Sequence, residues 1–313
     1  MCFRLVPARI FLCCLMVLGL SSCLARRRLI TRNGQKTTQT LAVADAKALL
    51  QRISEQYERI HDFSATVDMV PALGSAEKSK ITEYKDVRGY ILFRKPADIR
   101  IIGLYPVVRA KAFDMVSNGT EFRLHIPAKN RFVTGRNDLA THSPNKMENL
   151  RPQHFLEAML VRPLDAAARE KTVLENFTDE NNAVYIVHYL RQTPEGGLLL
   201  ARQVWFDRVN LSLVRQLVFD PNGSILTDAR YTQWQLYDGV PFPKHIEINR
   251  PKDEYAVVLT VVKMDMNKGL TDDKFALAQP EGTVLQVLGE KAPATPQPAP
   301  PPAPKPKGRK GKK

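Results

Sequence analysis

The chain has 313 residues, of which 44% are hydrophobic and 25% charged, a composition that excludes wholesale disorder and collagen-like repeats. Its formal charge of +14 resembles that of a nucleic-acid-binding protein, but seven basic residues lie in residues 1–44 and seven in residues 291–313, with no acid in either segment. Residues 45–290 are therefore neutral overall, and nucleic acid is not an expected partner.

The first 23 residues have the pattern of an export signal. Arg4 and Arg9 precede an apolar stretch from Ile10 to Leu20, and a short run of small residues then ends at Cys23. The pattern resembles the lipobox of bacterial lipoproteins, which implies removal of residues 1–22 and lipidation of Cys23. All four cysteines lie in this segment, so we expect the rest of the chain to fold without disulfides. The alternative is a secreted protein cleaved elsewhere, in which Cys23 is incidental.

The position after Cys23 is Leu24, not the Asp that resembles an inner-membrane retention signal. We therefore expect a periplasm-facing protein anchored to the outer membrane, or to the cell membrane of a host with a single membrane. Residues 23–44 carry five basic residues and no apolar period, which predicts a tether between the lipid and the fold.

An amphipathic helix is predicted from Asp45 to Ile60. Apolar residues recur there at helical spacing, with charged residues between them. The residues on its apolar face include Leu49, Leu50, Ile53 and Tyr57. We expect this helix to open a folded domain that spans residues 45–290.

After this helix the apolar period becomes two, which is typical of strands. The predicted strands span residues 63–70, 81–94, 98–104, 108–117, 121–126, 131–135, 173–178, 183–191, 199–207, 212–220, 225–237, 245–249 and 255–266. Asn118-Gly119 predicts a tight hairpin turn, and nearly all the other connections are also short. Short connections favour a mainly antiparallel sheet and disfavour a βαβ architecture.

A second, shorter helix is predicted from Pro152 to Val161. Pro152 suits a first helical turn, and Phe155 and Met159 share one face. The tail at residues 291–313 is different, since it has eight prolines, seven basic residues and no aromatic residue. Such a segment is predicted to be disordered with polyproline character.

Several predicted strands are apolar on both faces, most clearly the run from Tyr255 to Val262. A half-exposed antiparallel strand would alternate between apolar and polar residues. The additional apolar side chains either line a cavity for an apolar ligand, or belong to a double-layered sandwich core or a dimer interface.

No arrangement of residues typical of catalysis is present, and the chain is interpreted as a binding protein and not an enzyme. There is no nucleophile elbow, no His-Glu-x-x-His and no phosphate-binding loop. His154 and Glu157 lie at i, i+3 on the second helix, but a metal site needs further ligands that the sequence does not offer. We expect neither a metal nor a cofactor.

Four stretches carry short motifs, each made of common turn and strand residues and therefore of low specificity by itself, and they follow one another in a fixed order. Asp62–Asp68 follows the first helix, and Gly89–Arg100 fits G-x-Φ-x-Φ-x-[KR]-P-x-x-Φ-[RK], with Φ apolar. Val116–Pro127 has the form of a hairpin, and Leu270–Gly282 fits L-x-D-x-x-F-x-Φ-x-x-P-x-G. Together they resemble the bacterial LolA/LolB lipoprotein carrier and receptor superfamily over about residues 45–288.

The resemblance implies an α+β fold that is mainly antiparallel, an incomplete β-barrel whose concave apolar face is capped by helices. It also implies a site that holds the acyl chains of lipids or lipoproteins. The expected cavity face consists of Phe93, Ile99, Ile101, Phe113, Met115, Phe122 and Leu124. The expected lids are the two helices, through Leu49, Leu50, Ile53, Tyr57, Phe155 and Met159.

The lipobox favours the receptor side of the superfamily, because carrier members are soluble and the receptor is itself a lipoprotein. The receptor also has an exposed loop with an apolar tip. The matching place here is Gly103–Val108, where Leu104 and Tyr105 are the residues expected to enter the membrane. The alternative is that these two residues continue a buried strand.

Three functions are therefore open. The first is lipid or lipoprotein binding for transport or insertion at the outer membrane, with a soluble carrier protein as a possible partner. The second is a regulatory sensor of the same fold, and the third is a structural lipoprotein that tethers the envelope. The basic tail either binds anionic lipid, lipopolysaccharide or wall polymer, or only aids solubility.

Overall fold

The computed structural model describes residues 40–75, 80–83, 86–138, 149–165, 167, 170–178 and 182–289. The predicted signal peptide, Cys23, most of the tether and the tail at residues 291–313 lie outside the described residues. All described helices and strands belong to one compact unit that begins at Leu41.

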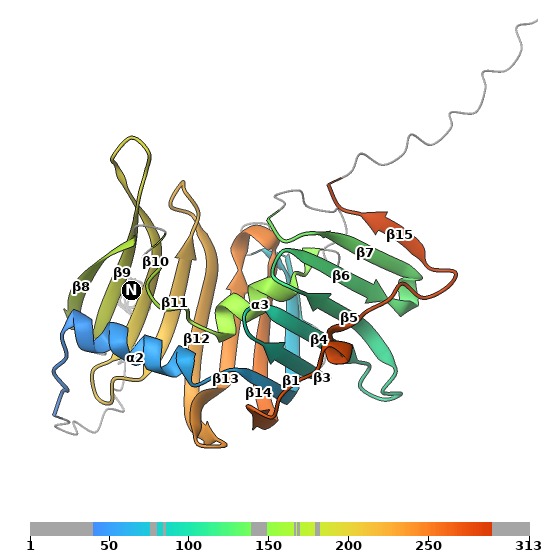
Figure 1. The fold of residues 1–313 in the computed structure, drawn as a ribbon, viewed down its shortest axis with the longest axis horizontal. Coiled ribbons are helices and arrows are strands. Elements are labelled where there is room, and N and C mark those ends of the chain that lie inside the picture. Colours follow the sequence, from blue (N-terminus) through green and yellow to red (C-terminus); the bar gives the residue numbers. More distant parts are fainter. Residues whose placement is uncertain are drawn as a thin grey trace, which may run out of the picture. The chain divides into compact units, whose positions relative to one another are not determined.

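The described strands form a single open sheet (Figure 1). They are β1 (Asp62–Ser75), β2 (Lys80–Glu83), β3 (Val87–Arg94), β4 (Asp98–Leu104), β5 (Lys111–Ser117), β6 (Glu121–Ile126), β7 (Arg131–Arg136), β8 (Glu170–Thr178), β9 (Ala183–Gln192), β10 (Leu198–Asp207), β11 (Leu213–Phe219), β12 (Ile225–Tyr237), β13 (Val240–Arg250), β14 (Tyr255–Met266) and β15 (Val284–Val287). Their order is β15-β7-β6-β5-β4-β3-β1-β14-β13-β12-β11-β10-β9-β8, and β2 pairs with β1. The edge strands β15 and β8 do not pair with each other, so the barrel is incomplete, as predicted.

Two helices, α2 (Ala46–Glu58) and α3 (Pro152–Met159), lie against the sheet (Figure 1). The side chain of Asp45 caps α2, because its Oδ1 accepts a hydrogen bond from the backbone N–H of Ala48 at 2.8 Å. Pro152 occupies the first turn of α3, where no intrahelical donor is needed. Three short 3₁₀ segments follow strands: η1 (Pro127–Lys129), η3 (Pro251–Asp253) and η4 (Asp272–Phe275).

The structure differs from the predicted elements at several places, and β13 begins at Val240 although its strand was predicted only from residue 245. The first strand continues to Ser75 instead of ending at Val70, and it pairs with β2. The single predicted strand at residues 81–94 is two strands, β2 and β3, both of which pair with β1. β15 was not predicted, and it lies parallel to β7, whereas the other neighbouring strands in the described sheet are antiparallel.

The main core lies between the two helices and one face of the sheet. Alternation along β4 places Ile99 and Ile101 in this core, while Arg100 points to the opposite face. A second, smaller core lies on the opposite face, where Val116 and Phe132 pack against Leu277, and Phe275 packs beside them. Some strands are therefore apolar on both faces because the chain after β14 covers the outer face of β4–β7.

Three arginines hold this C-terminal strap, residues 270–288, against the outer face. Arg94 donates to the carbonyl of Leu270 at 3.1 Å, Arg100 to that of Lys274 at 3.0 Å, and Arg123 to that of Leu277 at 3.2 Å. Because they come from β3, β4 and β6, the strap crosses the sheet and then adds β15 beside β7. Two distant motifs of the sequence, around Arg100 and around Phe275, therefore meet in space.

Candidate functional site

The predicted cavity residues lie together on the sheet face that meets the helices. Phe93, Ile99, Ile101, Met115, Phe122 and Leu124 are buried, and Phe113 is partly buried against the same cluster. They come from β3, β4, β5 and β6, and neighbouring strands place them side by side, as in the pairs Ile101–Met115 and Met115–Leu124. These residues therefore share one face of the sheet.

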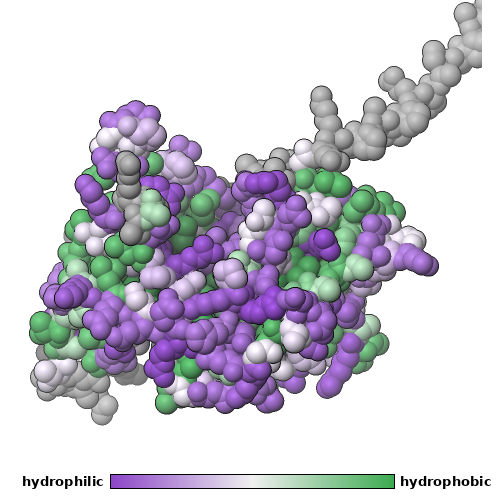
Figure 2. All heavy atoms as spheres, viewed as in Figure 1, coloured by the Kyte–Doolittle hydropathy of each residue, from purple (hydrophilic) through white to green (hydrophobic). Residues whose placement is uncertain are grey.

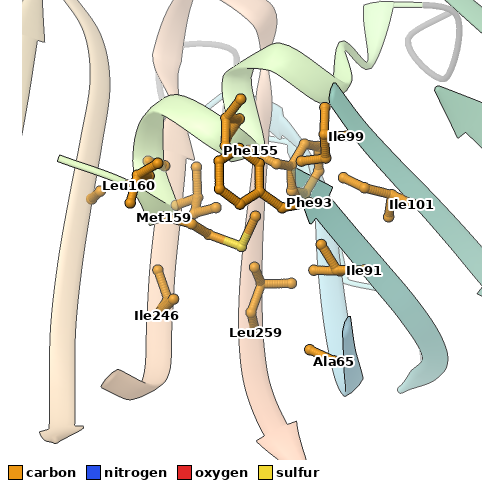
Figure 3. Packing of buried hydrophobic residues seen from close by; sticks show 14 of the residues in the cluster. Ala65, Ile91, Phe93, Ile99, Ile101, Phe155, Met159, Leu160, Ile246 and Leu259 are labelled. Atoms are coloured by element: carbon orange, nitrogen blue, oxygen red, sulfur yellow. The ribbon is translucent and has the colours of Figure 1, made fainter. Parts of the chain in front are cut away.

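The concave face is not an open cavity in this structure, because α3 fills it. Figure 3 shows Phe155 and Met159 of α3 directed at the sheet among Phe93, Ile99 and Leu259. The Phe155 ring also stacks on Tyr255 of β14, with 6.3 Å between the ring centres. The side chains of α3 thus fill the concave face in this structure.

The other predicted lid, α2, contributes to the same apolar cluster. Leu49 and Ile53 are buried, and Leu50 and Tyr57 pack against them at its edge. Lys95 holds the end of this helix, since its Nζ donates to the carbonyl of Tyr57 at 2.7 Å and lies 4.0 Å from the centre of the Tyr57 ring.

An apolar crevice separates the two helices at the end of α3. Its walls include Ile53 and Tyr57 of α2, Met159 of α3, and Tyr231 and Trp234 of β12. Its volume is about 10 Å³, at the lower limit for a single water molecule. The two lids are therefore closed on each other here.

Polar side chains of three neighbouring strands hold the end of α3 and the chain that follows it. The Tyr231 hydroxyl donates to the carbonyl of Ala158 at 2.6 Å, and Gln216 Nε2 donates to that of Glu157 at 3.1 Å. The partly buried Arg202 guanidinium donates to the carbonyl of Arg162 at 2.6 Å. These bonds satisfy carbonyls at the end of α3, where intrahelical partners are missing.

The beginning of α3 is held by a buried polar cluster around His154. Its Nδ1 lies 3.1 Å from the Tyr255 hydroxyl and its Nε2 lies 3.1 Å from the Arg250 guanidinium. Arg250 in turn pairs with Asp253 at 2.7 Å and donates to Thr227 at 2.6 Å. Burial raises the pKa of the Tyr255 hydroxyl, so it remains a neutral hydrogen-bonding group.

His154 and Glu157 are not arranged as metal ligands. Both ring nitrogens of His154 already face Tyr255 and Arg250. Within the described ranges, no group of three or more His, Cys, Asp or Glu side chains lies close enough to hold a metal ion.

The predicted membrane loop lies between β4 and β5, and its exposed apolar residues are further along than expected. Leu104 is the last residue of β4 and is half-buried, while Tyr105 is 40% exposed. Val107 and Val108 are 91% and 73% exposed. The tip of the loop therefore presents two valines that the sequence interpretation had not selected.

The residues that hold α3 were also missed by sequence reasoning. Tyr231, Gln216 and Arg202 lie on β12, β11 and β10, and 40 to 73 residues separate them from the carbonyls they bind. These residues lie on predicted strands, but nothing in the sequence gives their partners.

No family model matches the chain, and no curated protein matches it. Solved structures similar to it include a LolA superfamily protein from Nitrosomonas europaea, with 15% identity, a TM-score of 0.46, and 73% of this chain and 97% of that chain covered. A DUF1329 family protein from Desulfovibrio piger has 16% identity and a TM-score of 0.47, with 73% and 94% covered. A putative outer membrane lipoprotein-sorting protein domain from Vibrio parahaemolyticus has 14% identity and a TM-score of 0.47, with 74% and 97% covered.

The superfamily that the sequence motifs resemble is thus represented among the similar structures. The similarity concerns the course of the backbone, and identities this low do not transfer a ligand to this chain. No helix in the described part of the chain combines the length and apolar character needed to cross a membrane.

Proposed function

We propose that the chain is a lipid-anchored, periplasm-facing protein that holds acyl chains of lipids or lipoproteins between its open sheet and the helices α2 and α3. One observation carries this proposal: the residues predicted for the cavity and those predicted for the lids form a single apolar cluster, in which the short helix α3 fills the concave face. Cys23 would supply the lipid anchor.

In this proposal α3 competes with the ligand for the same surface. Burying an acyl chain contributes about 0.8 kcal/mol per CH₂ group, so about ten carbons supply several kcal/mol. The chain must displace Phe155 and Met159 from the sheet, which removes part of this gain. The net affinity is then moderate, as a protein that passes its ligand on requires.

The crevice between α2 and α3 is the proposed entrance. Its walls include Ile53 of α2 and Met159 of α3, which also belong to the apolar cluster under α3. Opening it requires α3 to lose the hydrogen bonds that Tyr231, Gln216 and Arg202 donate to its end. These bonds are few, so the closed state is stabilised without being permanent.

Photo-crosslinking tests the location of the ligand. The full chain, in a neutral detergent, is irradiated with a palmitic acid analogue that carries a diazirine near its methyl end, and the labelled peptides are identified by mass spectrometry. We expect labels on peptides that contain Phe93 to Ile101 and Met115 to Leu124, and we expect unlabelled palmitic acid to suppress them.

Labels confined to the loop between β4 and β5 or to the edge strand β8 would contradict the proposal, as would the absence of labels that palmitic acid suppresses. Either result would favour the sensor or the tethering hypothesis for this fold.

We also propose that the exposed loop at residues 105–110 enters the lipid surface. Val107 and Val108 are its most exposed apolar residues, and the exposed Arg109 follows them with a charge suited to anionic head groups. In vesicles that contain brominated phosphatidylcholine, the bromine atoms should quench the fluorescence of a Trp that replaces Val107.

The matched control for this loop is Leu198→Trp, which places a Trp at another exposed apolar position, 54% exposed, on the hairpin between β9 and β10. Equal quenching at both positions would overturn the assignment of the loop.

A further inference from the structure

A large polar cleft lies on the side of α3 that faces away from the apolar cluster. Its volume is about 1060 Å³, and Gln153, His154 and Glu157 of α3 line it. Phe155 and Met159 of the same helix are buried in the apolar cluster. Figure 2 shows that the surface over α3 is mainly hydrophilic on this face of the molecule.

The acidic residues of the cleft are largely neutralised by its own cations. Asp138 pairs with Arg136 at 2.9 Å, and Asp253 pairs with Arg250 at 2.7 Å. Asp220 pairs with Lys252.

The fourth acid, Glu157, is the exception. Burial raises the pKa of its carboxyl group, an effect that the charges of Arg250 and Arg162 oppose.

Two further arginines line the cleft, so its lining has five basic and four acidic residues. Arg151 is buried, and burial lowers the pKa of its guanidinium. The Arg162 side chain donates no hydrogen bond to any residue that the structure describes, and it acts on Glu157 through its charge. The cleft therefore offers cationic donors that suit an anionic group.

Two buried amide oxygens of residues that line the cleft have no hydrogen-bond partner among the residues that the structure describes. Gln153 is only 7% exposed, and its Oε1 accepts no hydrogen bond. Asn137 Oδ1, also in the lining, is buried and likewise without a donor. An unpaired buried acceptor costs about 1–3 kcal/mol, so both atoms favour a ligand that brings hydroxyl donors.

Arg151 joins this cleft to the apolar cluster. Its guanidinium carbon lies 4.2 Å from the centre of the Phe122 ring, and Phe122 belongs to the apolar cluster under α3. A ligand with a polar head and an apolar chain could therefore occupy both spaces, with Arg151 at the boundary.

We propose that the cleft binds a phosphate-bearing, hydroxylated head group of the amphiphile whose acyl chains enter the apolar interior. The arginines contact the phosphate, and the amide oxygens of Gln153 and Asn137 accept hydrogen bonds from the hydroxyl groups. This inference rests on the proposed function and adds the chemistry of the head group to it.

Three probes test the inference on the full chain in a neutral, sugar-headed detergent. They are dihexanoyl phosphatidylglycerol, dihexanoyl phosphatidylcholine and glycerol 1-phosphate, and isothermal titration calorimetry measures their affinities. We expect phosphatidylglycerol to bind about tenfold more tightly than phosphatidylcholine, since only the former offers hydroxyl donors and a net negative charge. Glycerol 1-phosphate alone should bind weakly, because it has no acyl chain.

Two variants locate the effect in the cleft. Gln153→Leu should lower the affinity for phosphatidylglycerol several-fold and leave that for phosphatidylcholine unchanged, because only phosphatidylglycerol has head-group hydroxyls. Arg162→Gln should lower the affinity for both lipids, because both carry the phosphate that the arginines contact. Arg191→Gln is the matched control, because Arg191 lies on β9, outside the cleft lining, and its side chain is 58% exposed. Circular dichroism of each variant checks that it is folded.

The outcomes separate this inference from the proposed function. Equal affinities for the two lipids, unchanged in both variants, would overturn the head-group site and leave acyl binding in place. No binding of either lipid would overturn both proposals. Glycerol 1-phosphate that binds as tightly as the lipid would show a site for a free phosphorylated polyol instead.

Discussion

Tyr231 connects the sheet to the helix that fills the concave face through one hydrogen bond. Its hydroxyl is buried and donates to the carbonyl of Ala158 at 2.6 Å. Burial raises the pKa of this hydroxyl, so it stays protonated and remains a donor. Tyr231→Phe leaves the carbonyl without this donor, and we expect urea unfolding to show a loss of about 1–2 kcal/mol in the free energy of unfolding.

Tyr237→Phe provides the control for this prediction. The Tyr237 hydroxyl is buried too, but the polar side chain beside it, Gln235, comes from its own strand, and no hydrogen bond joins it to another described element. Removing it should change the free energy of unfolding by less than about 0.5 kcal/mol. Similar losses in the two variants would show that the bond from Tyr231 to Ala158 adds nothing beyond side-chain packing.

At the scale of elements, the C-terminal strap depends on Arg94 of β3. This guanidinium donates to the carbonyl of Leu270, pairs with Asp272 at 2.7 Å and lies 5.0 Å from the centre of the Phe275 ring. Arg94→Met removes these contacts together, and it also removes the ion pair of Arg94 with Asp98 of β4 at 2.6 Å. We expect hydrogen–deuterium exchange at residues 270–277 to become several-fold faster, because the strap opens more often.

Arg88→Met is the matched control on the same strand. Arg88 also forms an ion pair, with Asp68 at 2.9 Å, but that pair joins two neighbouring strands of the sheet and is exposed. It should leave exchange in the strap unchanged. Faster exchange in both variants would indicate a general loss of stability and not a local role for Arg94.

The strap also shows which features could be predicted from the sequence and which could not. The motif at residues 270–282 was visible, but its function was not, because the contacts of Asp272, Phe275 and Leu277 come from strands more than 140 residues earlier. Gly89 is similar. The motif includes this glycine, but the sequence does not explain why a glycine is needed there. The structure does, because a Cβ at this position would lie 2.4 Å from the carbonyl oxygen of Ile102 on β4.

Periodicity sufficed where a residue's environment depends on its own element. It identified α2, α3 and the shared face of Ile99 and Ile101, because alternation and helical spacing are local properties. It could not show that α3 itself occupies the concave face, since that depends on how Phe155 meets Tyr255 a hundred residues later. The polar cleft was missed for the same reason, as its lining is assembled from separate turns and strands.

At the scale of the whole molecule, two carboxyl groups give stability opposite responses to pH. Burial alone would raise the pKa of Asp114, but hydrogen bonds from Arg100 at 2.8 Å and Lys111 at 2.7 Å outweigh burial and lower it. Burial raises the pKa of Glu157, and the nearby arginines only partly offset this effect. The lowered pKa of Asp114 therefore makes the fold less stable in acid, whereas the raised pKa of Glu157 makes it less stable toward neutral pH.

The direction of each effect follows from the number of protons bound. Asp114 binds its proton less tightly in the folded state, so its stabilisation is present above the pKa of the unfolded chain and is lost as pH falls through the folded value. Glu157 binds its proton more tightly when folded. Its contribution is complete below the unfolded pKa and is lost as pH rises through the folded value.

Two substitutions separate these contributions in urea titrations from about pH 3 to about pH 8. Asp114→Asn should flatten the loss of stability in acid and lower the free energy of unfolding at neutral pH by about 3 kcal/mol, because Arg100 loses its buried partner. Glu157→Gln should remove the decline toward neutral pH, because the amide resembles the protonated carboxyl, which the buried site favours. If the free energy of unfolding of Asp114→Asn falls in acid as steeply as that of the unmodified chain, other carboxyl groups cause the acid response.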